Sequence, residues 1–253
     1  MDVPPHPHTG LQTVSWLFDG HITHHDSGDN HAVVRPGELN IMTAGAGFCH
    51  SEVSTSNSEV LHGVQLWTVL PDSARFTKRR FEHYAPEPVS FNGGEALVFL
   101  GSLLGSDSPV ETYSPLVGAE IRLGPGAPLS IPVSETFEHG ILVDAGDVSL
   151  NGSGVSPSEL AYFAPGEAQI EIRNDSPTKS RVLLIGGAPF EEEFIMWWNF
   201  IGRTHEEIAR FREEWESGDA RFGQVDGYIG RTPGAATRLP APKLPPIKLK
   251  PRK

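Results

Sequence analysis

Two pairs of metal-ligating side chains share the same spacing near the start of the chain. His6 and His8 form one pair, and His50 and Glu52 form the other. Side chains at positions i and i+2 of a β-strand point to the same face, so each pair can present both donors to one point. If the two strands lie side by side, three imidazoles and one carboxylate converge. That donor set suits a divalent Fe, Mn, Ni, Cu or Zn ion and leaves coordination positions for water, O₂ or a substrate.

The residues around both pairs resemble the two metal motifs of the pirins, a family of two-cupin proteins. The similar segments are residues 6–14, 35–39, 42–52, 61–67, 108–110 and 184–190, which together span most of the chain. The resemblance implies that His6, His8, His50 and Glu52 are the metal ligands and that the metal is Fe(II). It also implies that the C-terminal cupin carries no metal.

Two features differ from the patterns of these families. Cupins in general place a glutamate shortly after the paired histidines, and this chain has Gln12 there. Glu52 is therefore expected to be the only anionic ligand, which leaves the site net positive and favours an anionic or chelating oxygen substrate. Pirins also usually have residues before the first motif, whereas this chain begins almost on it. Either other segments flank His6 or the start is truncated.

Short apolar or alternating segments, separated by frequent Gly and Pro, predict the strands that position these pairs. The segments are 11–17, 39–43, 64–69, 96–100, 141–143, 168–172 and 182–185. This succession is typical of all-β sandwiches and barrels. We expect two tandem β-barrels, which the resemblance identifies as cupin (jelly-roll) barrels. Residues 1–117 would form the metal-binding domain and residues 118–230 the domain without metal.

A helix and an extended tail are predicted at the C-terminal end. Thr204 and Glu207 have the spacing of a capping box, and an apolar stripe at Ile208, Phe211 and Trp215 predicts a helix over 204–217. Residues 231–253 contain seven Lys or Arg, six Pro and no acidic residue, which favours an extended path. This basic tail either lies on the acidic remainder of the chain or is a mobile arm for a protein partner.

Composition excludes several classes of function. The 253 residues carry a formal net charge of −12, which argues against direct nucleic-acid binding and against adsorption to anionic lipid. There is no apolar run of membrane-spanning length and no secretory signal, so we expect a cytoplasmic protein. The single cysteine, Cys49, excludes an internal disulfide and a cysteine-based zinc site.

Other candidate residues have simpler interpretations. Four histidines in a polar stretch are expected at a solvated hairpin tip, with a second metal site as the alternative: His21, His24, His25 and His31. His62 lies between apolar residues and is expected to be a hydrogen-bonded core histidine or a residue that orients a ligand. Cys49 should face away from His50 as a small buried apolar residue, with a redox role as the alternative.

Two functions from different classes remain. The resemblance implies a metal-dependent dioxygenase acting on a small molecule, a flavonol such as quercetin or another enol. Glu52 would be a ligand and the base that removes the hydroxyl proton. The alternative is a non-enzymatic, iron-dependent regulatory protein that binds a protein partner through surface loops or the basic tail. A third possibility is a cupin that has lost its function and binds no metal.

Overall fold

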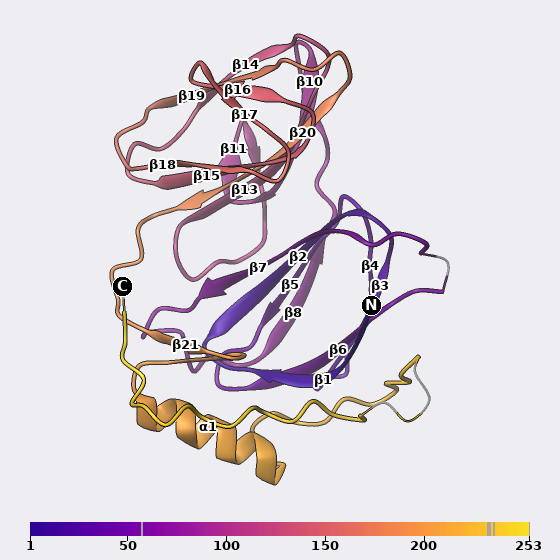
Figure 1. The fold of residues 1–253 in the computed structure, drawn as a ribbon, viewed down its shortest axis with the longest axis vertical. Coiled ribbons are helices and arrows are strands. Elements are labelled where there is room, and N and C mark those ends of the chain that lie inside the picture. The colour runs from indigo at the N-terminus through magenta and orange to yellow at the C-terminus, as the bar shows by residue number, and fades with distance from the viewer. Residues whose placement is uncertain (57, 232–233, 235, 253) are drawn as a thin grey trace. The chain divides into compact units, whose positions relative to one another are not determined.

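The computed structural model describes residues 1–56, 58–231, 234 and 236–252. The chain is mainly β-structure and divides into two compact units, Met1–Tyr84 with Glu191–Lys253 and Ala85–Phe190 (Figure 1). Each of the seven predicted strand segments overlaps an observed strand, so the all-β two-cupin prediction is confirmed. Among the described residues, no helix combines the length and the apolar character needed to cross a bilayer.

The first unit contains two four-stranded antiparallel sheets. One sheet has the order β1-β6-β3-β4 and the other the order β7-β2-β5-β8. The strands of the first sheet are β1 (Asp2–His8), β6 (Phe48–Ser54), β3 (Ile22–Asp26) and β4 (His31–Val34). Those of the second are β7 (His62–Val69), β2 (Leu11–Asp19), β5 (Leu39–Thr43) and β8 (Arg80–Tyr84). Strands β1, β6 and β3 are adjacent, which brings the two predicted ligand pairs into one sheet.

The predicted helix forms as α1 (His205–Ser217), after a short hairpin of β21 (Ile195–Trp197) and β22 (Phe200–Gly202). The Thr204 hydroxyl accepts a hydrogen bond from the Glu207 N–H, and Gly218 ends the helix in the left-handed conformation. The Glu207 carboxylate accepts from the Arg203 N–H at 2.7 Å, one residue earlier than a standard capping box predicts. The apolar stripe of α1 is buried in a cluster that includes Cys49 of β6, so α1 covers the outer face of the ligand-bearing sheet.

The described part of the basic tail lies on the first unit. The Leu239 N–H donates to the Pro5 carbonyl of β1 at 2.9 Å, and the Trp215 indole donates to the Leu239 carbonyl at 2.8 Å. Lys248 pairs with Glu206 of α1. In Figure 1 the yellow C-terminal segment runs alongside α1. Of the two predicted arrangements, the structure shows the tail packed on the chain, where it supports strand β1.

The second unit is built from a six-stranded sheet, a four-stranded sheet and a two-stranded hairpin. The six-stranded sheet has the order β18 (Leu160–Phe163), β15 (Glu138–Ala145), β20 (Ser180–Gly187), β13 (Leu116–Leu123), β10 (Gly94–Leu100) and β9 (Val89–Phe91). The four-stranded sheet has the order β14 (Pro128–Pro132), β19 (Gln169–Asn174), β16 (Val148–Leu150) and β17 (Ser153–Val155). The hairpin pairs β11 (Ser102–Leu103) with β12 (Ser106–Asp107).

The compact units differ from the domains predicted at 1–117, 118–230 and 231–253. Residue 117 lies inside β13, which pairs with β10, so the second unit already begins at Ala85. The acidic, proline-bearing loop of residues 105–115, just before the predicted boundary, is a connection within the second unit. At the other end, the chain from Glu191 onward packs on the first unit, because the stripe of α1 covers the outer face of β6.

Candidate metal centre

Three adjacent strands of the first unit place six donor side chains on one face of a sheet. In the strand register, His6 of β1 lies opposite His50 of β6, and His50 lies opposite Asp26 of β3. Glu52 of β6 lies opposite His24 of β3 in the next row. Two-residue alternation then adds His8 to the same face. All six side chains are buried.

Three imidazoles converge at the centre of this array. The Nε2 atoms of His8 and His50 face each other at 3.1 Å, and the His6 ring centroid lies 4.4 Å from that of His50. One donor atom from each of His6, His8 and His50 lies within 4.8 Å of the other two. Two nitrogens bound to one ion at about 2.1 Å and at right angles would be about 3 Å apart, so the observed separation suits a shared transition-metal ion.

The electrostatic environment favours neutral imidazoles. Burial holds the pKa values of His8 and His50 well below the usual value, and the neighbouring histidines lower them further. Burial also lowers the pKa of His6, although the Pro4 carbonyl and Glu52 act in the opposite direction. A neutral imidazole has a free nitrogen lone pair, which is the form that binds a metal ion.

The carboxylate of Glu52 is held from the facing sheet. Its Oε1 atom accepts a hydrogen bond from Gln65 Nε2 of β7 at 2.8 Å. A carboxylate oxygen of Glu52 forms a second donor group with His24 and His50, again within 4.8 Å of one another. The structure therefore gathers three of the four predicted ligands in one group and joins Glu52 to the shared residue His50 in another.

His24 and Asp26 belong to this array, so the prediction that His24 lies at a solvated hairpin tip is wrong. Their exposed fractions are 3% and 2%. His24 Nε2 lies 3.0 Å from Asp26 Oδ2, and the His24 ring stacks on Phe81 with centroids 4.6 Å apart. Burial acts to raise the pKa of Asp26, but hydrogen bonds from His24 and from the backbone at Gly28 and Asn30 outweigh it and leave the pKa lowered. The i, i+2 spacing of His24 and Asp26 is the signal that could have identified them.

The other histidines of this stretch remain outside the array. His21 and His25 are partly exposed and His31 is exposed. Neither donor group found among the described residues includes them. His62 is also exposed, at the start of β7, where its ring meets Phe18 edge-on. The prediction of a core histidine at position 62 is therefore wrong.

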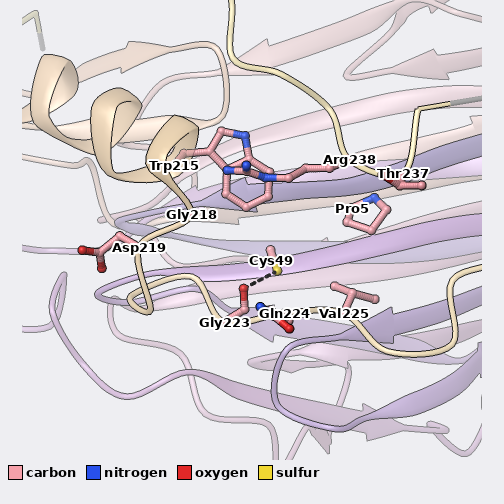
Figure 2. Close-up of a pocket in the computed structure, with 10 residues that line it drawn as sticks. All are labelled: Pro5, Cys49, Trp215, Gly218, Asp219, Gly223, Gln224, Val225, Thr237 and Arg238. Carbon is pink, nitrogen blue, oxygen red and sulfur yellow. Dashed lines mark hydrogen bonds between the residues drawn. The ribbon is translucent and has the colours of Figure 1, made fainter.

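Cys49 faces away from His50, as the alternation predicts. It lines a cavity of about 310 Å³ on the outer face of β6, together with Pro5, Trp215 and Arg238 (Figure 2). Its thiol donates to the Gly223 carbonyl at 3.6 Å, and burial raises its pKa to about 11. A thiol that stays protonated at neutral pH is a poor nucleophile, which agrees with a packing role.

The sheet opposite the array contributes polar and aromatic side chains. Gln12 donates to the Thr43 hydroxyl at 2.9 Å, so this neutral residue is held by its own sheet. The Trp67 ring of β7 meets His8 edge-on, with centroids 5.2 Å apart, and is 37% exposed. The imidazole cluster thus has the partly exposed Trp67 ring as a neighbour.

Comparison with known proteins identifies the family. Residues 1–68 match the Pirin family model, and residues 118–223 match the model of the pirin C-terminal cupin domain. A Pseudomonas aeruginosa protein, provisionally named a quercetin 2,3-dioxygenase, is 40% identical over 96% of this chain and 75% of its own length. Human pirin is 32% identical over 82% of this chain and 73% of its own length.

Solved structures of similar proteins support the same family assignment. A quercetin 2,3-dioxygenase structure from Acinetobacter baumannii superimposes with a TM-score of 0.90 at 38% identity, covering 98% of this chain and 80% of the other. The Escherichia coli pirin YhhW, solved with nickel(II), has the same fold at 24% identity and a TM-score of 0.62, covering 75% of this chain and 77% of its own. The chain belongs to the pirin family of two-cupin proteins, and its histidine-rich centre suits a divalent metal ion.

Proposed function

We propose that this protein is a metal-dependent dioxygenase that acts on a flavonol of the quercetin type or on another enol. The observation that carries the proposal is the meeting of three buried imidazoles, two with facing nitrogens at 3.1 Å, beside a buried carboxylate. The 38% identity to the Acinetobacter quercetin 2,3-dioxygenase structure over nearly the whole chain supports this choice of chemistry. In this proposal His6, His8, His50 and Glu52 hold the ion, and iron(II) is its expected identity.

The bound ion would supply a Lewis acid at which the substrate oxygen and O₂ can meet. The residues of the chain provide the surroundings. Gln65 holds one oxygen of Glu52, so the carboxylate has a fixed direction and an oxygen left to bind the ion or to take the hydroxyl proton of the substrate. Trp67 offers a partly exposed ring beside His8, against which a planar aromatic substrate can stack. Orientation of this kind replaces a random encounter with an oriented one.

The first test measures binding of the ion. Metal-free protein is loaded separately with Fe(II), Mn(II), Ni(II), Cu(II) or Zn(II), and stoichiometry and affinity are measured. We expect one ion per chain in the wild type and at least a roughly hundredfold weaker affinity in His50→Ala, because a direct ligand should matter no less than its supporting residues. His139→Gln, which changes a buried histidine of the second unit, is the matched control and should bind as the wild type does.

The second test measures catalysis. The loaded protein is mixed with quercetin in air, and loss of flavonol absorbance and uptake of O₂ are followed. Turnover above that of the free ion, lost in Glu52→Ala, is expected. Turnover equal to that of the free ion, or unchanged in Glu52→Ala, would contradict the proposal.

The regulatory function and the protein partner stay predictions. Two basic residues of the tail contact the rest of the first unit while staying exposed, Lys248 at Glu206 and Arg231 at Ser54.

A further inference from the structure

A series of hydrogen bonds leads from Asp26 and His24 of strand β3 to the proposed ligand His50. Asp26 Oδ2 lies 3.0 Å from His24 Nε2, and His24 Nδ1 lies 3.3 Å from His50 Nδ1. The opposite nitrogen of His50, Nε2, is the atom that faces His8 at 3.1 Å. The side chains of Asp26, His24 and His50 are all buried, and Phe81 stacks on the His24 ring. Their geometry is therefore fixed by packing.

The direction of these hydrogen bonds follows from the Asp26 end. Asp26 Oδ1 accepts the backbone N–H groups of Gly28 at 2.8 Å and Asn30 at 3.1 Å, so the carboxylate is anchored by donors. A carboxylate only accepts, so His24 Nε2 carries a hydrogen and donates it. In neutral His24, Nδ1 is then the acceptor, and His50 Nδ1 must donate to it. The lone pair of His50 is left on Nε2.

His6 shows the same device with a different acceptor. Its Nδ1 atom lies 2.9 Å from the Pro4 carbonyl oxygen, which can only accept. The lone pair of neutral His6 is therefore on Nε2, as in His50. A backbone carbonyl is supplied by local chain geometry, whereas the acceptor behind His50 has to come from the neighbouring strand.

We propose that His24 and Asp26 are positioning residues that hold His50 as the Nδ1–H tautomer, with its Nε2 lone pair directed at the ion. The role in metal binding rests on the proposed function, but the tautomer is a property of the metal-free protein. His50 cannot donate from Nδ1 to His24 and also bind an ion through Nδ1. The donor group of His24, His50 and Glu52 is therefore not a second metal site: His50 and Glu52 are ligands of the single ion, and His24 supports His50.

Replacing Asp26 by Asn reverses the donor and acceptor roles along this series of hydrogen bonds. Three donors meet Asp26 Oδ1, namely the backbone N–H groups of Gly28 and Asn30 and the Asn30 side-chain amide, so the amide oxygen of the new side chain takes this position. Its NH₂ group then faces His24 Nε2, and the Asn30 amide gives up its contact with the Oδ2 position. His24 Nε2 then accepts, His24 Nδ1 donates, and His50 becomes the Nε2–H tautomer with no lone pair toward the ion. A purely structural role for Asp26 does not predict this reversal.

The experiment reads the tautomer directly. The metal-free full chain is labelled with ¹⁵N-histidine, and long-range ¹H–¹⁵N correlation spectra report which nitrogen of His50 carries hydrogen, with His50→Gln identifying its signals. We expect Nδ1–H in the wild type, Nε2–H in Asp26→Asn, and no fixed preference in His24→Phe, which keeps an aromatic ring against Phe81. Affinity for Zn(II) should fall about 10- to 100-fold in both variants. His139→Gln is the control.

Two results would overturn the proposal. One is a wild-type His50 that carries its hydrogen on Nε2, a measurement that needs no variant to fold. The other is a second Zn(II) ion per wild-type chain that is lost in His24→Phe, which would make His24 a ligand. A failure of quercetin turnover leaves the tautomer result unchanged, so the two proposals fail separately.

Discussion

The two barrels of this chain share an architecture but differ in what fills them. In the second unit, cross-strand neighbours such as Ile131 and Ile170 belong to a continuous cluster of buried aliphatic side chains. In the first unit, the cross-strand neighbours His6 and His50 are polar, and Glu52 is buried beside them. Strand alternation decides only that these positions face inward, and the residue type decides whether the interior is a core or a site.

This difference has an energetic consequence for the first unit. Buried polar groups cost free energy unless they are hydrogen-bonded, and here Gln65 bonds Glu52 while Gln12 bonds Thr43. Such bonds offset a cost but add little net stability. The first unit has several separate apolar clusters, and the one on the outer face of β6 is supplied largely by the C-terminal segment, where Phe211 of α1 packs with Cys49 and other residues. The C-terminal segment thus adds apolar packing to a unit whose interior includes the polar site.

The largest effect should come from that outer cluster. Phe211→Ala is expected to reduce the free energy of unfolding by about 3–5 kcal/mol, as in a true core, because Phe211 is 1% exposed. Denaturant titration of the full chain measures it. Glu213→Ala, at an exposed position of the same helix, should stay within about 0.5 kcal/mol of the wild type. A loss below about 1 kcal/mol in Phe211→Ala would show that the stability of the first unit lies elsewhere.

The next largest effect tests whether the hydrogen bonds of the polar interior contribute to metal affinity. Gln65→Ala removes the donor that fixes Glu52 and should weaken metal affinity by roughly tenfold, or about 1.4 kcal/mol. Titration of metal-free protein with Zn(II) measures this change. Gln169→Ala on β19 of the second unit is the matched control, since Gln169 is exposed. An affinity within about twofold of the wild type in Gln65→Ala would mean that the direction of Glu52 is set without Gln65.

The sequence was informative where a short-range rule was enough. The two-residue period placed His6 with His8 and His50 with Glu52 on common faces, and the capping pattern at Thr204 located α1. Cross-strand register could not be derived, because His6 and His50 meet only through pairing of distant segments. The same limit explains the domain boundary, since α1 packs on β6 from more than 150 residues away.

His24 and Asp26 were missed for a related reason. The sequence from Asp26 to Asn30 is rich in Asp, Ser, Gly and Asn, which is typical of an exposed turn. A turn does form there, with Asp26 accepting from the Gly28 N–H. Its burial, however, depends on the pairing of β3 with β6, and local polarity contains no information about that pairing. A turn-forming residue can therefore also belong to a buried site.

The smallest expected effect concerns how α1 is attached to the first unit. Glu207 accepts from the Arg203 N–H and from the Arg75 guanidinium. Burial acts to raise the pKa of Glu207, but these bonds outweigh it and leave the pKa lowered. A lowered pKa means that the folded state releases the proton more readily, so the stabilisation is complete above the unfolded value near 4.5 and is lost as the pH falls.

Glu207→Gln should therefore reduce the free energy of unfolding by roughly 1 kcal/mol at pH 7, since this ion pair is only partly buried. The difference from the wild type should shrink as the pH falls below about 4.5, because the protonated wild-type side chain then resembles the amide. Denaturant titrations at pH 7 and at lower pH measure it, with Glu167→Gln in an exposed turn of the second unit as the control. If this difference in unfolding free energy stays constant over the pH range, Glu207 acts through its size and hydrogen bonds and not through its charge. The ion pair with Arg75 would then add nothing to the stability that α1 gives the first unit.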